Sequence, residues 1–397
     1  MRMEFACICL SLSIAFLVQT MLLVAVPLSA IELGATPLAL GLLVSAPYVL
    51  PLCLALSFGS VVARWGSARP LKLGAAGMVL GAWLLTALPG FQGLIAGQLV
   101  IGLAQLMMII SAQTAVSYFG KGTKLERYFG WYTTFLSVGQ MLGPLLAGWI
   151  IDHRGGTSSA IHAAFLLSLV SLVAIFISNK RKGHGGDKTK LGLKVGLARQ
   201  LALIKNTHGV QLSMIVSLAA MLALGAHSSY LPVYLESLAL SGTTIGLIVS
   251  LRALSSMAIR PFTSMTVRLL RGRYATMALT MAFMASGLLL TGFAGNFYLL
   301  CCFSILVGVG VGLSQPLSMV VIAEEVVEEQ RAQALAMRLM ANRAMQFLAP
   351  LLLGFATQLG GFTVAYFICG VLLFLHLALF NWLRRRHDRN LVRQFSE

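Results

Sequence analysis

Two arginines lie inside long apolar runs of the sequence, where a charged side chain is costly. Arg252 is the deeper of the two, and Ser256 follows it at i+4 on the same helical face. Arg338 lies in a second run, where Asn342 and Gln346 follow at i+4 and i+8. Because charges at membrane depth tend to line solute pathways, we interpret both stripes as a binding surface for an anionic or zwitterionic solute.

A structural role is the alternative for the second stripe. Arg338 and its neighbour Arg343 could brace the end of their helix against loop carboxylates such as Glu324 and Glu325. The sequence alone leaves both interpretations open, because it does not say which side chains meet.

Uncharged polar side chains inside the apolar runs can supply further hydrogen bonds to a solute. Their alternative role is to join neighbouring helices to one another. We predict that four of them contribute to the binding surface, namely Gln19, Gln105, Tyr230 and Gln315.

Proton carriage requires a titratable side chain, and the sequence offers few at depth. None of the 12 carboxylates lies at the centre of an apolar run. Glu32, Glu236 and Glu324, at predicted helix ends, are candidates, although a solvated helix-end charge is the alternative for each. His227 lies deeper, and histidine changes its charge near neutral pH. A neutral histidine that is hydrogen-bonded inside a helix bundle is equally compatible with the pattern.

The apolar runs that must position these residues are long enough to cross a bilayer. The composition is 58% hydrophobic and only 10% charged, whereas soluble domains are about 25% charged. A spanning helix needs about 20 apolar residues, so the pattern predicts an all-α integral membrane protein with twelve transmembrane helices. The predicted segments are 5–31, 37–62, 71–89, 92–118, 128–152, 158–178, 208–235, 242–265, 274–293, 297–322, 333–358 and 361–383.

The basic residues predict how these helices are oriented. With both termini cytoplasmic, most of the 29 Lys and Arg fall in cytoplasmic loops, in the interval 179–207 or in the tail 384–397. We therefore attribute the net charge of +17 to topology rather than to a nucleic-acid partner. The predicted domains are a bundle at 1–178, a basic cytoplasmic linker at 179–207, a bundle at 208–383 and a basic tail at 384–397, placed in the inner (plasma) membrane.

The two predicted bundles repeat one another. Val26-Pro27 and Gly41 to Ser45 match Leu231-Pro232 and Gly246 to Ser250 at an offset of 205. The stretch from Gln140 to Pro144 matches that from Gln346 to Pro350 at an offset of 206. Parallel six-helix repeats place a substrate near the membrane midplane, between the halves.

The stretch Trp131–Trp149 combines an apolar span with the pattern GxxxGPxxxG, formed by Gly139, Gly143, Pro144 and Gly148. Glycines four residues apart share a helical face and allow a neighbouring helix to approach closely. Proline removes a backbone donor and bends a helix within the membrane. The pattern predicts a bent, closely packed helix.

This run resembles the fifth-helix motif of drug–proton antiporters in the major facilitator superfamily, and the whole chain resembles a twelve-helix transporter of that superfamily. A second family motif has the usual form GxLaDrxGrr between helices two and three. Gly59, Arg64 and Gly66 match it, but Ala63 occupies the position of the usual aspartate. In the family that aspartate helps to latch the inner side, so the resemblance leaves open what replaces it.

The resemblance implies a secondary active transporter that exports a small amphipathic or anionic molecule, such as a drug, a siderophore or a metabolite. It also implies alternating access, proton antiport, a lipid bilayer around the protein and a monomeric state. An importer or symporter of an organic anion is the alternative within the fold. An enzyme is less favoured, because no clustered metal ligands and no phosphate-binding GK[ST] loop are found in the sequence. We predict no cofactor and no metal.

Overall fold

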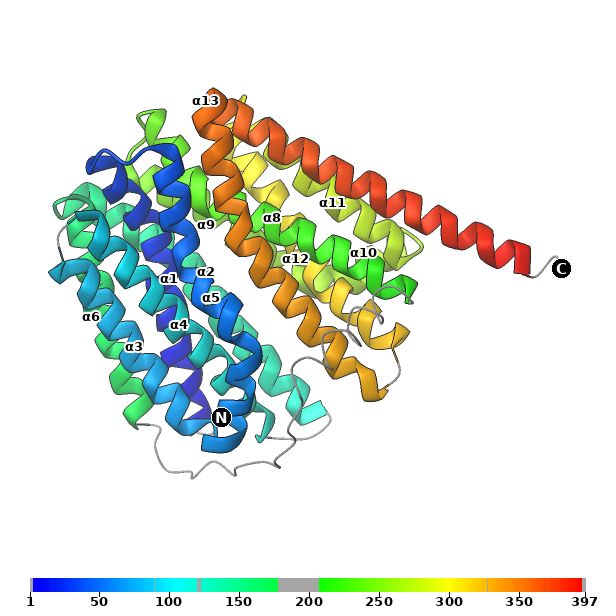
Figure 1. The fold of residues 1–397 in the computed structure, drawn as a ribbon, viewed down its shortest axis with the longest axis horizontal. Coiled ribbons are helices and arrows are strands. Elements are labelled where there is room, and N and C mark those ends of the chain that lie inside the picture. Colours follow the sequence, from blue (N-terminus) through cyan, green and yellow to red (C-terminus); the bar gives the residue numbers. More distant parts are fainter. Residues whose placement is uncertain (1–2, 89, 120–122, 178–206, 327, 395–397) are drawn as a thin grey trace. The chain divides into compact units, whose positions relative to one another are not determined.

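The computed structural model describes residues 3–88, 90–119, 123–177, 207–326 and 328–394, and every regular element within them is helical (Figure 1). The elements of the first half are α1 (Met3–Glu32), α2 (Pro37–Trp65), α3 (Ala68–Ala87), α4 (Gly90–Ser117), α5 (Thr123–His153) and α6 (Gly156–Ile177). Those of the second half are α8 (His208–Ser237), α9 (Gly242–Ile259), η1 (Arg260–Phe262), α10 (Thr263–Leu269), α11 (Arg273–Thr291), α12 (Phe297–Glu325) and α13 (Glu328–Gln394).

Eleven stretches of helix in the described residues are long and apolar enough to cross a membrane. The last of them, Met337–Arg386, is 50 residues long, and its backbone is not helical at Gly360 and Gly361. This break separates the predicted segments 333–358 and 361–383. The all-helical membrane fold predicted from hydropathy is therefore confirmed.

Several boundaries differ from the predicted ones. The predicted segment 242–265 is interrupted by η1, because Pro261 has no N–H to donate and its ring clashes with the preceding turn. The helix then continues as α10. α5 begins before residue 128 and α13 continues past residue 383, since hydropathy marks only the lipid-facing part of a helix. Most of the predicted linker 179–207 lies outside the described residues.

The chain divides into two compact units. The first comprises Met1–Thr189, Ser228–Ala253 and Pro350–Gln358, and the second comprises Lys190–His227, Leu254–Ala349 and Leu359–Glu397. In the first unit α1 packs against α5 and α6, α3 packs against α4 and α6, and α2 packs against α4. α1 is apolar on all sides, as expected of a helix that other helices surround.

Polar contacts also join the helices of the first unit. Ser11 Oγ of α1 donates to the carbonyl oxygen of Ser171 in α6 at 2.9 Å, and Ser171 Oγ donates back to that of Ser11 at 2.8 Å. Reciprocal bonds of this kind satisfy hydroxyl groups that water cannot reach within a bilayer.

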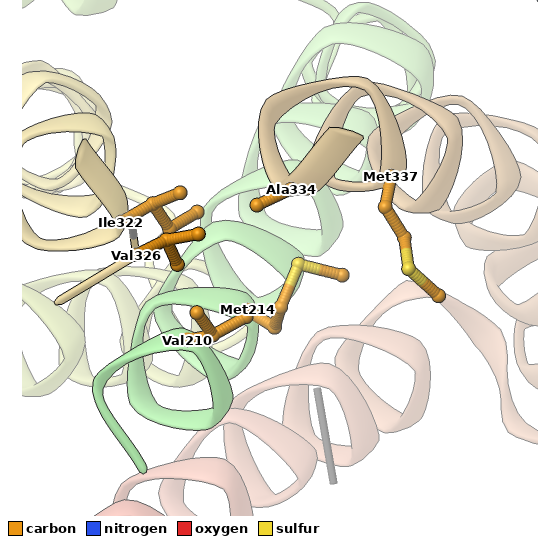
Figure 2. Packing of buried hydrophobic residues seen from close by; sticks show 6 residues of the cluster. All are labelled: Val210, Met214, Ile322, Val326, Ala334 and Met337. Atoms are coloured by element: carbon orange, nitrogen blue, oxygen red, sulfur yellow. The ribbon is translucent and has the colours of Figure 1, made fainter. Parts of the chain in front are cut away.

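A hydrophobic cluster holds together three helices of the second unit. Val210 and Met214 lie one turn apart on α8 and meet residues from the end of α12 and the start of α13 (Figure 2). This packing fixes the first turns of α13, which carry Arg338. The buried members of the cluster are Val210, Met214, Ile322, Val326, Ala334 and Met337.

Candidate functional site

The first two glycines of the α5 pattern lie where α1 approaches most closely. A Cβ atom at Gly139 would meet the carbonyl oxygen of Ser13, and one at Gly143 would meet Leu17 O at 2.5 Å. Thr20 Oγ1 of α1 also lies 3.3 Å from the carbonyl oxygen of Gly139. The glycines therefore bring the backbones of α1 and α5 into contact.

Gly148 serves a different neighbour. It comes five residues after Gly143, which turns it by about 140° around the helix, so it cannot share the face of the first two glycines. It packs against the carbonyl oxygen of Gly242 at the start of α9, and Gly246 packs against that of Pro144. Ser250 Oγ of α9 donates to the carbonyl oxygen of Met141 at 2.8 Å. We call the contact formed by Pro144, Gly148, Gly242 and Gly246 the α5–α9 seam.

The repeat produces a matching contact between α2 and α13. A Cβ atom at Gly41 would meet the carbonyl oxygen of Pro350 at 2.8 Å, and one at Gly354 would meet that of Pro37 at 2.8 Å. These residues correspond to Gly246, Pro144, Gly148 and Gly242 at the offsets 205 and 206. We call the contact formed by Pro37, Gly41, Pro350 and Gly354 the α2–α13 seam.

Different polar groups accompany the two seams. At the α2–α13 seam, Tyr230 Oη donates to the carbonyl oxygen of Pro37 at 2.8 Å, and the tyrosine is fully buried. At the α5–α9 seam, the carboxylate of Asp152 accepts from the backbone N–H of Gly242 and of Thr243, each at 2.7 Å. Tyr230 thus bonds to a helix backbone, as in the helix-joining alternative for a polar side chain at this depth.

Sequence analysis did not single out Asp152. An acidic residue at the end of an apolar segment resembles a solvated helix-end charge, and only the approach of α9 distinguishes it. The sequence does contain a weak signal for Asp152. The equivalent position in the second repeat is Gln358, so only the first repeat carries an acidic residue there.

Arg338 is almost completely buried, with 3% of its surface exposed, and its bonds go to α12. Nε donates to Ser318 Oγ at 3.1 Å, and Nη2 donates to Gln315 Oε1 at 2.7 Å and to Gln315 O at 3.4 Å. All three acceptors are neutral. In the described part of the chain no carboxylate forms an ion pair with Arg338. Among the described residues, no opposite charge lies beside the guanidinium.

Gln315 presents a second donor beside Arg338. Its Oε1 is occupied by the guanidinium, and its Nε2 is buried without a hydrogen-bond partner among the described residues. A buried donor that lacks an acceptor is costly, so an acceptor supplied by a ligand would stabilise it. The pair has the chemistry of an oxyanion-binding site.

The loop carboxylates have other partners. Glu324 forms an ion pair with Arg273 of α11, and Glu325 Oε1 accepts from Tyr274 Oη at 3.1 Å. The bracing alternative for Arg338 is therefore not seen among these groups.

The other two residues of the second stripe, Asn342 and Gln346, contact α8, and Gln346 also accepts from the neighbouring Arg343. Ser217 Oγ donates to Asn342 Oδ1 at 2.7 Å, and Arg343 Nη1 donates to Gln346 Oε1 at 2.9 Å. Gln346 Nε2 lies 3.3 Å from Met221 Sδ. Asn342 and Gln346 therefore face α8, whereas Arg338 bonds to α12.

The first stripe is buried but falls in different units. Arg252, 7% exposed, belongs to the first unit, whereas the buried Ser256 belongs to the second. In the first unit Gln105 is buried and Gln19 is half-buried. That Arg252 and Arg338 both belong to a binding surface for a solute therefore stays a prediction.

The titratable candidates occupy varied surroundings. His227 is buried, and its Nε2 lies 3.1 Å from Ser304 Oγ of α12, so it is hydrogen-bonded inside a helix bundle. Glu32 is exposed and accepts from Thr157 Oγ1 at 2.6 Å, which joins the ends of α1 and α6. Glu236 and Glu324 are exposed. Proton carriage by any of them stays a prediction.

The second motif is only partly described. Gly66 ends α2 with a φ of 73°, a left-handed conformation that glycine adopts easily. Gly59, Ala63 and Arg64 belong to α2, but their surroundings lie outside the described part of the structure.

Comparison with known proteins identifies the fold. The family model of the Major Facilitator Superfamily matches residues 8–265 and 213–396. Similar solved structures include a POT family transporter in complex with a thioalcohol-conjugated peptide, at 13% identity and a TM-score of 0.79, covering 97% of this chain and 96% of that chain. The nucleoside transporter NupG is similar at 14% identity and a TM-score of 0.77, and the match covers 96% of this chain and 100% of that chain.

A bacterial homolog of the human lysosomal transporter Spinster is similar at 11% identity and a TM-score of 0.74, covering 96% of each chain. No match was found among curated proteins. At these identities the solved structures show the fold alone, while the family model covers more than half of the chain. From the match and the twelve-segment helical architecture together, it follows that the chain belongs to the Major Facilitator Superfamily of membrane transporters.

Proposed function

We propose that this protein is a secondary active transporter that exports a small amphipathic or anionic molecule by alternating access, in exchange for protons. The two bundles at 1–178 and 208–383 alternate in exposing the solute to each side of the inner (plasma) membrane. The linker 179–207, the tail 384–397 and both termini are cytoplasmic, and one chain suffices.

The observation that carries the solute class is the environment of Arg338. Its guanidinium is buried, its three hydrogen bonds go to neutral acceptors, and no described carboxylate pairs with it. An isolated buried charge is strongly unfavourable, whereas a charge that meets an opposite charge with good geometry is not. A bound oxyanion would complete the site, using Arg338 and the buried Nε2 of Gln315 as donors.

The direction of transport rests on α5. The run Gly139, Gly143, Pro144 and Gly148 resembles the corresponding helix of drug–proton antiporters, and its glycines lie where α1 and α9 approach. For the other candidate residues we propose the roles that the sequence predicts. Arg252, Ser256, Asn342, Gln346, Gln19, Gln105 and Tyr230 would bind solute, while His227, Glu32, Glu236 or Glu324 would carry protons.

Small-molecule pools of cells with and without the protein test the proposal. We expect one or more anionic compounds to fall inside the cells and rise outside when the protein is present. Arg338→Met should reduce this difference by about tenfold or more, since a charged hydrogen-bonding partner is worth about 1.5–3 kcal/mol. Arg268→Met is the matched control, because it removes the same charge from an exposed side chain.

Membrane abundance and a single size-exclusion peak must be equal in both variants. If the pools do not change with the protein, export is contradicted. If Arg338→Met behaves like Arg268→Met, the assignment of Arg338 is contradicted.

Import of an organic anion is the second candidate, because a buried arginine favours neither direction. Similar structures include a peptide transporter and a nucleoside transporter. Everted membrane vesicles separate the two directions, since an exporter accumulates the identified solute inside them when the vesicle interior is acidic. Accumulation only in right-side-out vesicles would instead support import.

A further inference from the structure

We propose that Asp152 is a latch that holds the α5–α9 seam closed by capping the N-terminus of α9 from another helix. The inference rests on the proposed alternating access, because a latch has a role only if this seam opens during transport. It assigns that role to a residue of the α5 end that the family motifs do not contain.

Side chains cap three N–H groups at the start of α9. The first four N–H groups of a helix have no partner within it. In α9, Gly242 N donates to Asp152 Oδ1 and Thr243 N to Asp152 Oδ2, each at 2.7 Å. Thr244 N donates to Ser241 Oγ at 3.3 Å, and the regular helical bonds begin with Ile245 N, which donates to Ser241 O at 2.9 Å. Two of the three side-chain caps therefore come from α5, and separation of the helices would remove both together.

The electrostatics favour the same contact. A helix N-terminus carries a partial positive charge, and a carboxylate there is stabilising. Both oxygens of Asp152 are engaged at once, which sets the position of α9 along α5 as well as its distance. Because Asp152 is exposed, solvent reduces the strength of the interaction.

The close backbone contact between Gly148 and Gly242 brings the start of α9 within reach of Asp152. A Cβ atom at Gly242 would meet Asp152 Oδ1 at 2.7 Å and the carbonyl oxygen of Gly148 at 2.9 Å. A side chain at this position would therefore crowd both the carboxylate of Asp152 and the backbone of α5.

The repeat supplies an internal comparison. The α2–α13 seam reproduces the glycine contacts, but the position equivalent to Asp152 is Gln358, which is exposed and for which no hydrogen bond is found among the described residues. The N-terminus of α2 is capped locally, by Thr36 Oγ1, which accepts from Ala39 N at 3.3 Å. The latch is therefore confined to one seam, whereas the glycine packing is common to both.

A contact between α1 and α6 shows at which end of the first unit Asp152 lies. Glu32 at the end of α1 meets Thr157 at the start of α6, directly after the end of α5. Asp152 therefore lies at the end of the unit away from the start of α1. On the proposed topology this is the outer side, so the latch would favour the state that is closed to the outside.

Thiol labelling at two repeat-equivalent serines tests the latch. Ser250 and Ser45 are both buried and lie in α9 and α2, beside the two seams. Ser250→Cys and Ser45→Cys serve as reporters, labelled in membranes with an impermeant maleimide. Labelling is read by mass spectrometry of each peptide, so the native cysteines stay in place.

We expect Asp152→Asn and Asp152→Ala to raise the labelling rate at both reporters by about fivefold, the effect of a helix-terminal charge contact near a surface. Gly242→Ala should do the same, because its methyl group separates Asp152 from α9 without removing a charge. Gln358→Ala, the change at the equivalent position, should leave both rates unchanged.

Unchanged rates in Asp152→Ala would overturn the proposal. A rise at Ser250→Cys alone would overturn it too, because it would mean local loosening rather than opening of the protein. The size-exclusion peak of each variant shows whether it is folded. Gly242→Ala disrupts the contact between Asp152 and α9 from the α9 side, which keeps the test decisive if the Asp152 variants do not fold. No solute is needed, so a failure here is distinct from unchanged small-molecule pools, which would contradict the proposed function.

Discussion

At the scale of single residues, Arg338 is a buried charge for which no opposite charge is found among the described residues. A charged side chain at depth usually pairs with an opposite charge, a backbone carbonyl or water. Here the partners among the described residues are a serine, a glutamine side chain and one carbonyl oxygen. The site is therefore ordered but not neutralised, as expected if a ligand brings the missing charge.

Gln315→Glu should separate ligand binding from structural stability. A glutamate at this position would form an ion pair with Arg338, since Gln315 Oε1 already lies 2.7 Å from Nη2. We expect the melting temperature of the purified protein to rise or stay the same, while transport of the anionic solute falls by about tenfold. Thermal unfolding and solute pools measure the two effects.

A purely structural role for the pair predicts a different result. If Gln315 only holds Arg338 in place, the stronger ion pair should preserve transport. Full activity in Gln315→Glu would therefore contradict the ligand assignment, whatever the change in stability.

At the scale of elements, α5 is organised by its spacing. Gly139 and Gly143 are four residues apart and contact α1, whereas Gly148 is displaced to the other side and contacts α9. One helix thus makes close backbone contacts with two neighbours. Pro144 lies between the two sets and contributes its carbonyl oxygen to the α5–α9 seam.

Gly143→Ala should destabilise the protein. The new methyl group would meet Leu17 O at 2.5 Å and Met21 N at 2.9 Å, and backbone atoms cannot move aside as a flexible side chain does. Overpacking costs about 1–3 kcal/mol, partly offset by the better helix propensity of alanine, about 1 kcal/mol. We expect a lower melting temperature, measured by thermal unfolding in detergent.

Gly295→Ala is the matched control. It adds the same methyl group between α11 and α12, where no atom lies within 4 Å of the new position. Its melting temperature should equal that of the unmodified protein. An equal melting temperature in Gly143→Ala would show that α1 and α5 can separate without cost.

At the scale of the whole molecule, the internal repeat relates the two seams. Pro37, Gly41, Pro350 and Gly354 repeat the contacts of Gly242, Gly246, Pro144 and Gly148. The polar groups beside them do not repeat, since Tyr230 accompanies one seam and Asp152 the other. The repeat thus preserves the packing of the backbone, while the polar contacts have diverged.

Coupling of solute transport to protons is a property of the whole molecule. In everted vesicles, we expect solute accumulation when the interior is more acidic than the medium, because protons leaving the vesicle drive solute in. An ionophore that collapses the pH gradient should abolish accumulation, and His227→Gln should uncouple it if His227 carries the proton. Accumulation that is indifferent to the gradient would contradict proton antiport.

Much of the fold followed from the sequence, because each span is defined by its own composition. The twelve apolar segments, the repeat at offsets 205 and 206 and the glycine pattern of α5 are local or periodic features. Lipid forces each such segment to satisfy its own backbone, so hydropathy alone predicts helices. The structure corrected only helix ends and the break at Pro261, where local geometry overrides hydropathy.

The partners of individual side chains depended on the tertiary structure. The sequence places Arg338 at membrane depth but cannot say that Gln315 and Ser318 of another helix meet it. It places Asp152 at a helix end but cannot say that the start of α9 lies against it. Composition and period determine which face of a helix is apolar. Whether a polar group on that helix finds a partner is decided by the approach of a second helix, which is 20 to 23 residues away in the chain for Arg338 and 90 residues away for Asp152.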